Sequence, residues 1–295
     1  MKSFIYKVFF LALLSMVLVT ALKLAKPKNY NSAMVDKLLL LKKYQHQRKI
    51  VLIGGSSVGW GISAKQIEDT THLPTINLGL HAGFGLMDFQ SFVQSMIQPD
   101  DIIIFSPEWI FYENPNYHDP ATLQDLYSNS AYLDLTEKST YTKFSSLFLR
   151  RVMVLNYVEL HPEKSPYRYD CMNKNGDIVS HCGLKPTGPE DYVISFERFN
   201  FEQFKQAFPF VTRPNTFIVF PPTQKRIYVK YVAKLNQLQA ILSKHNLHVV
   251  NSVEENVHES SDFFDLQYHL TCEVREKRTE TIIQYLRAFL KTTPK

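Results

Sequence analysis

The sequence predicts an α/β fold in which a parallel β-sheet lies between two layers of helices. Short apolar runs alternate with helix-like segments across residues 49–109, and crossovers of that length join parallel strands of one sheet. The same alternation returns across residues 215–291. Residues 111–200, which lie between these two parts, are rich in Tyr, Asn, Ser, Asp and Pro and do not follow the pattern. We therefore expect one domain that carries a long insertion beside the functional site.

The first part of the fold is expected to supply three strands and two helices. The apolar run at 49–53 stops at Gly54 and Gly55, which is typical of a buried parallel strand that ends in a tight turn. Another apolar run follows the turn at Pro99 and Asp100. The expected order is a strand at 49–53, a helix at 63–70, a strand at 75–79, a helix at 85–97 and a strand at 101–106.

The second part is expected to complete the sheet with two more strands and two helices. An apolar run at 215–220 ends at Pro221 and Pro222, and a further short run follows at 247–251. Between them, residues 225–246 carry an apolar stripe at helical spacing. Thr271 is placed to cap a last helix. Within the insertion, the sequence favours one helix near 141–155.

The N-terminus carries a segment that is typical of membrane targeting. Residues 8–22 form an apolar run with only two mildly polar residues, as in a signal peptide or a signal anchor. Counted from Phe4, the run reaches the length of a membrane span if Lys7 snorkels to the head groups. Cleavage after Ala21 stays an alternative, and we favour an uncleaved anchor.

We expect residues 1–28 to form this anchor with its juxtamembrane segment, and residues 29–295 to form a single domain. A short helix at 33–47 would link the two. Four lysines follow the apolar run and compete with the two that precede or interrupt it, so the positive-inside rule favours a cytoplasmic domain. The cysteines favour the extracytoplasmic (periplasmic) side instead, because disulfides persist in oxidising compartments. We expect the extracytoplasmic placement.

The three cysteines are not spaced like zinc ligands. Cys171 and Cys182 lie on either side of Asn175-Gly176-Asp177, which is a hairpin turn signal. We expect them to form a disulfide that closes a short loop, with two unrelated free thiols as the alternative. Cys272 would then be a core thiol. Cys171, His181 and Cys182 together make only a weak metal candidate, and we expect no metal.

Composition argues against a nucleic-acid partner. The formal net charge is +5, from 33 basic and 28 acidic residues. No extended stripe of Lys and Arg interleaved with aromatic residues marks a nucleic-acid groove. The hydrophobic fraction of 45% indicates a packed globular domain rather than a disordered chain.

The segment Gly54-Gly55-Ser56-Ser57 places a serine between a buried strand and a helix. Ligands of α/β proteins bind at the carboxyl ends of the strands, and N–H groups at the start of the next helix can face a developing oxyanion. Ser56 is therefore a candidate nucleophile. Two alternatives remain open. The serine caps the helix and does nothing more, or the turn is a phosphate-binding loop, although both glycine-rich consensus patterns are missing.

Asp265 precedes His269 by four residues, just ahead of the last expected helix. A histidine can take the proton of a serine hydroxyl, and an aspartate can hold the imidazole tautomer and stabilise its positive charge. This pair is therefore a candidate partner for Ser56. The alternative is ordinary surface polarity, because the chain contains ten histidines.

The two elements together resemble the first and last sequence blocks of the SGNH (GDSL) hydrolase superfamily. The first block, a strand followed by Gly-Asp-Ser, is matched by Gly54-Gly55-Ser56 with glycine in place of the aspartate. The last block, Asp-x-x-His, is matched by Asp265 to His269 with one extra residue. The phrases Gly-Gly-Ser-Ser-Val, Asn-Leu-Gly-Leu-His-Ala-Gly and Ser-Pro-Glu-Trp are similar to a membrane-anchored envelope subgroup that resembles polysaccharide O-acetylation and D-alanyl transfer proteins.

This resemblance covers residues 49–109 and 215–291 and implies a three-layer, flavodoxin-like fold with Ser56, Asp265 and His269 as its catalytic triad. It leaves the insertion largely uncovered. The family's second block supplies an N–H to the oxyanion hole, so the resemblance implies Gly83 as that donor beside the N–H of the nucleophile.

Three further positions are implied as supporting residues. Gly79 is the second choice of donor, and Asn77 belongs to the same block. The family's third block normally supplies an asparagine, but the corresponding Ser-Pro-Glu-Trp contains Glu108 instead. A glutamate carboxylate would repel an oxyanion unless it is protonated or turned away.

The resemblance implies a serine-dependent esterase or O-acyltransferase that acts on a small acyl group of a cell-envelope glycan and needs no cofactor. The expected partners are an acylated glycan or a small acyl ester, and a membrane-bound O-acyltransferase. One alternative is a non-catalytic glycan-binding or assembly protein, which Gly55 and the missing asparagine favour. Another is a nucleotide- or phosphate-binding protein, which requires anion contacts at residues 54–57.

Overall fold

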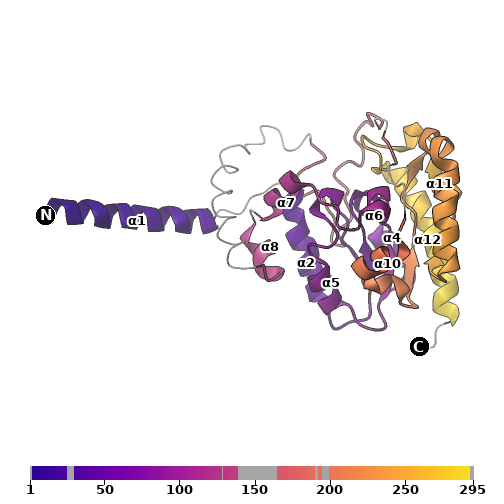
Figure 1. Cartoon of the computed structure of the whole chain (residues 1–295), viewed down its shortest axis with the longest axis horizontal. Helices are drawn as coiled ribbons and strands as arrows, with labels where there is room; N and C mark the ends of the chain where they lie inside the picture. The colour runs from indigo at the N-terminus through magenta and orange to yellow at the C-terminus, as the bar shows by residue number, and fades with distance from the viewer. Residues whose placement is uncertain are drawn as a thin grey trace.

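A computed structural model describes residues 2–24, 30–127, 129–138, 165–189, 192–194 and 199–292 (Figure 1). Five parallel strands form the central sheet, in the order β2-β1-β3-β4-β6. This order reverses between β1 and β3, as in flavodoxin-like folds, which bind ligands at the carboxyl ends of the strands at that point. The strands are β1 (Ile50–Ile53), β2 (Thr75–Asn77), β3 (Ile102–Phe105), β4 (Thr216–Ile218) and β6 (His248–Val249). The predicted α/β fold with a parallel sheet is confirmed.

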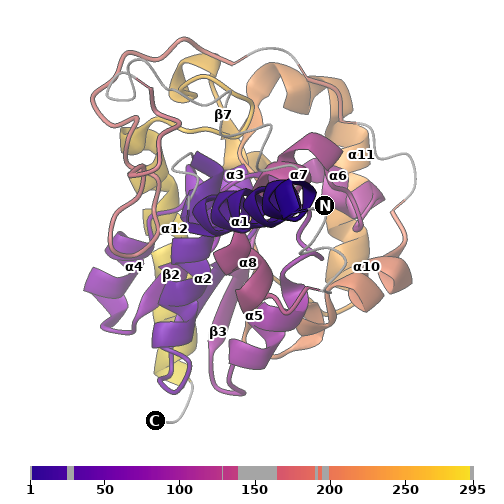
Figure 2. The same ribbon diagram turned by 90° about the vertical axis from the view of Figure 1, so that its left-hand side faces the viewer.

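Helices cover both faces of the sheet, because successive side chains of a strand point to opposite sides. Ile50 of β1 belongs to the apolar core beneath α4 (Ala64–Thr71) and α12 (Cys272–Thr292). Val51 belongs to the core on the other face. That face carries α2 (Ala33–Lys43), α5 (Gln90–Met96), α10 (Phe201–Ala207) and α11 (Lys225–Lys244), and Figure 2 shows α2 and α5 in front of the sheet.

The expected helix at 85–97 is shorter than predicted. A 3₁₀ turn, η2 (Ala82–Phe84), comes first, and Gly85 follows it with a φ of 72°. This left-handed conformation suits glycine and interrupts the helical path, so α5 begins only at Gln90. The other expected helices of the core are confirmed within a few residues of their predicted ends.

The insertion contains helices that the sequence did not predict. These are α6 (Trp109–Glu113), α7 (Pro120–Tyr127) and α8 (Ser130–Leu135). The helix expected near 141–155 lies outside the described residues. Met172 and Ile178 form an antiparallel bridge around Gly176, which has a φ of 87°, so the predicted hairpin turn is confirmed.

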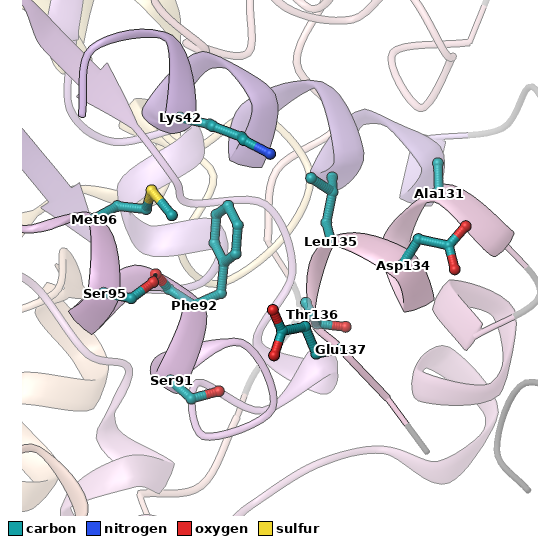
Figure 3. A pocket seen from close by; sticks show the side chains of 10 residues that line it. All are labelled: Lys42, Ser91, Phe92, Ser95, Met96, Ala131, Asp134, Leu135, Thr136 and Glu137. Carbon is teal, nitrogen blue, oxygen red and sulfur yellow. Dashed lines mark hydrogen bonds between the residues drawn. The ribbon is translucent and has the colours of Figure 1, made fainter. Parts of the chain in front are cut away.

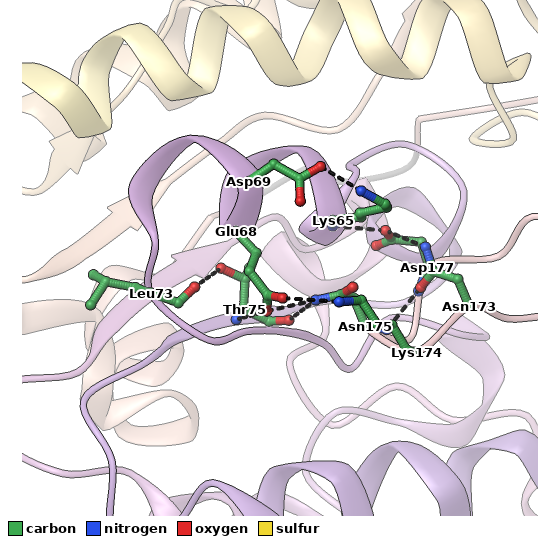
Figure 4. A network of polar contacts seen from close by, with 9 residues as sticks. All are labelled: Lys65, Glu68, Asp69, Leu73, Thr75, Asn173, Lys174, Asn175 and Asp177. Carbon is green, nitrogen blue, oxygen red and sulfur yellow. Dashed lines mark hydrogen bonds and ion pairs between the residues drawn. The ribbon is translucent and has the colours of Figure 1, made fainter.

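This hairpin is fastened to the first crossover helix. Asp177 accepts the N–H groups of Ala64 at 2.7 Å and Lys65 at 3.0 Å, which are two of the donors left unpaired at the start of α4. The Asn175 amide donates to Glu68 of the same helix at 2.8 Å (Figure 4). These hydrogen bonds attach the hairpin to α4.

Short elements connect the layers near the C-terminus. A second, two-stranded parallel sheet pairs β5 (Thr223–Gln224) with β7 (Val257–His258). Of its two strands, β7 precedes the segment that carries Asp265 and His269. Among the described residues, the other 3₁₀ turns are η1 (Tyr30–Ser32), η4 (Pro209–Thr212), η5 (Glu254–Asn256) and η6 (Ser260–Asp262).

The N-terminal segment forms α1 (Lys2–Leu24). It contains no charged residue between Lys7 and Lys23, and it exposes large apolar side chains such as Phe4 and Phe9. Within the part of the chain whose side chains are described, no helix combines the length and the hydropathy needed to cross a membrane.

The expected disulfide between Cys171 and Cys182 is wrong. Cys182 is bonded to Cys272, which lies 90 positions further along the sequence, and their Cα atoms are 5.6 Å apart. Cys171 is a buried free thiol in the core near Lys37, so Cys272 is not the leftover thiol. Nearness along the sequence suggested the first pairing, but the hairpin directs Cys171 inward while the chain carries Cys182 to the start of α12. The disulfide therefore joins the insertion to the last helix.

We expect alkylation of the unfolded, unreduced protein to modify Cys171 alone, as judged by mass spectrometry of its peptides. Replacing both Cys182 and Cys272 by serine should lower the free energy of unfolding by about 2–5 kcal/mol, because the unfolded chain gains conformational freedom. A reductant should lower the melting temperature of the wild type but not of this double variant. Alkylation of Cys182 or Cys272 without reductant would contradict the pairing.

Candidate active site

Glycines build the turn after β1 because no side chain fits there. A Cβ atom on Gly54 would lie 2.4 Å from the carbonyl oxygen of Ser106, and one on Gly55 would lie 2.5 Å from Oε1 of Glu108. The turn lets Ser56 begin α3 (Ser56–Gly59) directly after the strand. Ser56 thus stands at the carboxyl end of β1, as predicted, with 9% of its surface exposed.

Glu108 follows β3, and its carboxylate accepts hydrogen bonds from the backbone of this turn. Its Oε2 accepts the N–H of Gly55 at 3.1 Å, and its Oε1 accepts the N–H of Ser57 at 2.8 Å. The residue is fully buried, and burial raises the pKa of its carboxyl group, an effect that the hydrogen bonds from Ser57 and Gly55 partly offset. Both carboxylate oxygens are therefore engaged by the backbone of the turn.

Arg278 of α12 braces the same turn from the other side. Its guanidinium donates to the carbonyl oxygens of Ser57 at 3.2 Å, Gly61 at 2.9 Å and Phe220 at 2.8 Å. Burial lowers the pKa of Arg278, and the negative charge of Glu108 opposes that shift. A buried cation and a buried anion thus share the turn, which reduces the cost of burying either one alone.

Asp265 and His269 are brought together as predicted. Nδ1 of His269 lies 2.8 Å from Oδ1 of Asp265. The N–H of His269 donates to the carbonyl oxygen of Leu266 at 3.1 Å, so the chain turns between the two residues and aligns their side chains. Because Asp265 accepts the proton on Nδ1, Nε2 is left as the unprotonated nitrogen that a general base needs.

Two aromatic residues that the sequence analysis missed complete this arrangement. The ring of Trp60 stacks on His269, with centroids 4.1 Å apart and an interplanar angle of 3°. Tyr167, from the insertion, donates its hydroxyl proton to Oδ2 of Asp265 at 2.5 Å. Trp60 follows Ser56 by four residues, a spacing that the sequence shows, whereas no local pattern marks Tyr167.

Burial and pairing shift the two titrating groups of the pair in the same direction. Burial lowers the pKa of His269, although Asp265 opposes that shift. For Asp265, burial acts to raise the pKa, but the hydrogen bonds and charge of His269 and the hydrogen bond of Tyr167 outweigh it and leave the pKa lowered. Near neutral pH, the aspartate is ionised and the histidine is neutral, which is the state that a general base requires.

Ser56 and His269 share neighbours without a hydrogen bond between them in the described structure. The ring of Trp60 stacks on His269, and the backbone N–H of Trp60 donates to the carbonyl oxygen of Ser56 at 3.0 Å. The charge of His269 acts to lower the pKa of His81. The next residue, Ala82, lies close to the turn, since a Cβ atom added to Gly55 would be 2.7 Å from its nitrogen. Catalytic hydrogen bonds are often long in the absence of substrate.

The predicted oxyanion donors differ in their availability. The N–H of Gly83 donates to Nδ1 of His81 at 2.9 Å, and the N–H of Gly79 donates to Oδ1 of Asn77 at 2.9 Å. The N–H groups of Ser56 and Ala82 have no acceptor among the described residues. Ala82 is therefore a further candidate donor, and the role of Gly83 stays a prediction that requires His81 to move.

Asn77 orders the loop after the nucleophile. Its buried amide donates to the carbonyl oxygens of Val58 at 3.2 Å and Ile62 at 3.1 Å, and to Asp177 at 3.0 Å. All of these contacts are with protein groups, so its support of the site is indirect.

Cys171, His181 and Cys182, the weak metal candidate from the sequence, do not form one cluster. Cys171 lies apart, and the ligand atoms that lie within 4.8 Å of one another belong to His181, Cys182 and Cys272. Both of these cysteines are in the disulfide, and thiolates rather than disulfide sulfurs bind metals. Nε2 of His181 is also 3.1 Å from the carbonyl oxygen of Leu270.

A cavity of about 770 Å³ lies between α2, α5 and α8 (Figure 3). Lys42, Phe92 and Leu135 line it together with polar side chains. None of the candidate site residues contributes to its wall, so it is separate from the region around Ser56.

The fold and the site define an α/β protein that carries serine, histidine and aspartate at the carboxyl end of its sheet. No protein-family model, no curated protein and no solved structure matches this chain. The geometry of the site is therefore the main structural evidence on the function of this protein.

We expect Glu108→Ala to lower the free energy of unfolding by about 2–5 kcal/mol, because it leaves the buried N–H groups of Gly55 and Ser57 without acceptors. It also removes the negative charge that acts on the buried Arg278. Glu108→Gln, which keeps one acceptor oxygen, should cost less. Glu273→Gln is the control, since Glu273 forms an exposed ion pair with Lys277 and should leave stability nearly unchanged. Urea denaturation measures all three, and equal stability of Glu108→Ala and wild type would contradict the role of Glu108.

Proposed function

We propose that this protein is an SGNH-type esterase or O-acyltransferase with Ser56 as its nucleophile. The observation that carries the proposal is the Asp265–His269 pair, joined at 2.8 Å, in which the His269 ring stacks on Trp60. The backbone N–H of Trp60 donates to the carbonyl oxygen of Ser56. The position of Ser56 at the β1/β3 reversal of the sheet supports it, because ligands bind there in such folds.

In the proposed reaction, Oγ of Ser56 attacks the acyl carbonyl carbon while Nε2 of His269 takes the hydroxyl proton. The negative charge that forms on the carbonyl oxygen is held by the N–H of Ser56 and a second backbone donor, Ala82 or Gly83. His269 then gives its proton to the leaving oxygen as the ester bond breaks. Water or the hydroxyl of an acceptor attacks the acyl-serine, and His269 again removes and returns a proton. Asp265 stabilises the imidazolium in both halves.

The proposed substrate is a small acyl group on a cell-envelope glycan, and the proposed partner is a membrane-bound O-acyltransferase. Both follow from the resemblance of the three sequence phrases to envelope proteins. We place the domain on the extracytoplasmic side, attached to the membrane through its N-terminal segment. The disulfide between Cys182 and Cys272 supports an oxidising compartment, and the exposed apolar side chains of α1 support contact with a lipid phase.

A non-catalytic glycan-binding or assembly protein is the second candidate. Two observations favour it. Ser56 and His269 share no hydrogen bond, and the N–H of Gly83 is already taken by His81. Such a protein would bind at the same carboxyl end of the sheet, with Ser56 as an ordinary hydroxyl that substrates do not acylate.

The release of p-nitrophenol from p-nitrophenyl acetate distinguishes the two. We expect Ser56→Ala and His269→Ala each to reduce the rate to the level without enzyme, because each removes a group that forms or activates the acyl-enzyme. Ser57→Ala is the matched control, since the Ser57 hydroxyl donates to the carbonyl oxygen of Ser106 at 2.8 Å and should leave most of the activity. Activity that survives both of the first substitutions in folded protein contradicts the triad.

The pH dependence of kcat/KM follows from the lowered pKa of His269. The neutral imidazole is the active base, so activity should rise with pH through that pKa and then stay level. We expect the midpoint of this rise to lie below 6.5, the ordinary value for histidine. A midpoint above 6.5 would mean that His269 is not the group that limits activity on the acid side.

A further inference from the structure

Tyr167 reaches the Asp265–His269 pair from a strap of the insertion formed by residues 165–189. Its hydroxyl donates to Oδ2 of Asp265 at 2.5 Å and lies 3.2 Å from Nδ1 of His269. Asp265 therefore uses one carboxylate oxygen for His269 and the other for Tyr167. A carboxylate held at both oxygens cannot rotate freely, so the hydroxyl fixes the direction of the bond to His269.

The ring of Tyr167 is held by contacts that do not involve the hydroxyl. Tyr30 meets it edge to face, with centroids 5.3 Å apart and an interplanar angle of 82°, and Trp60 lies 5.4 Å away. Trp60 is itself fixed, because its Nε1 donates to the hydroxyl of Tyr30 at 2.9 Å. The disulfide of Cys182 ties the same strap to α12. Removing the hydroxyl alone should therefore leave the ring in place.

The hydroxyl also affects the charge that His269 experiences. Burial raises the pKa of Tyr167, so the phenol keeps its proton and acts as a donor to Asp265. A hydrogen bond to a carboxylate draws negative charge towards the donor. Without it, the charge of Asp265 would act more fully on His269 and raise the pKa of the imidazole.

We propose that Tyr167 is a positioning residue of this site, whose hydroxyl fixes the carboxylate of Asp265 and thereby sets the orientation and basicity of His269. The effect on rate rests on the proposed function, whereas the effect on His269 itself does not. The sequence predicts only that the insertion lies beside the site. Through Tyr167, the insertion contributes directly to the polar network of the site.

Other groups that face His269 are accounted for. Among the described residues, His181 and His81 are the other histidines whose pKa the charge of His269 acts to lower. Burial lowers the pKa of His181 to about 3, so that ring stays neutral while His269 titrates. Burial, and the charge of His269 itself, also lower the pKa of His81. A shift caused by Tyr167→Phe therefore reports on the Asp265 side of the ring.

The test measures the pKa of His269 by NMR titration of the full chain in detergent micelles, with the signal assigned by its loss in His269→Gln. Tyr167→Phe should raise this pKa. Tyr169→Phe is the matched control, because Tyr169 lies in the same strap with 41% of its surface exposed, and it should leave the pKa unchanged. An unchanged pKa in Tyr167→Phe, with or without a loss of stability, overturns the inference.

Kinetics give the second measurement on the same variants. For Ser56-dependent hydrolysis, Tyr167→Phe should lower kcat/KM by about 10- to 100-fold, as expected when a charge-assisted hydrogen bond is lost. The loss should appear in kcat rather than KM, and the acid limb of the pH profile should move to higher pH. If no Ser56-dependent hydrolysis exists in the wild type, the esterase activity of the proposed function fails, and the NMR titration still decides the role of Tyr167.

Discussion

The site depends on the buried carboxylate of Glu108 and its contacts with the turn that carries Ser56. Glu108 follows the third strand and binds the N–H groups of Gly55 and Ser57, and Arg278 binds the carbonyl oxygen of Ser57. The negative charge of Glu108 also acts on the buried guanidinium of Arg278 and opposes the lowering of its pKa by burial. Three segments that are distant in the sequence thus fix one another. They place the serine at the point where the order of strands reverses.

The site consists of two parts that meet at Trp60. One is the rigid turn around Ser56, and the other is the Asp265–His269 pair with Tyr167. The two parts are held by different constraints, since the second depends on the insertion and on its disulfide to α12. No hydrogen bond joins them across the described structure. The proposed chemistry therefore assigns to the substrate the task of bringing the hydroxyl and the imidazole into line.

The core of the fold was predictable because buried parallel strands and amphipathic helices leave patterns in adjacent residues. The same holds for Ser56 and for the pair formed by Asp265 and His269, whose spacing is local. Contacts made by the insertion were not predictable. Nothing near Tyr167 marks it as a partner of Asp265, and the cysteine nearest to Cys182 in sequence was not its partner. The polar insertion lacks the periodicity that fixes an orientation, so its contacts depend on the folded core.

Labelling with a fluorophosphonate, followed by mapping of the adduct by mass spectrometry, tests the central claim most directly, because such reagents phosphonylate serines that a neighbouring base has activated. The account predicts an adduct on the peptide that contains Ser56, formed on the oxygen of that residue. The adduct should disappear in His269→Ala while the protein remains folded. A folded wild-type protein that forms no adduct, or one whose adduct lies on another serine, would contradict the assignment of Ser56 as an activated nucleophile.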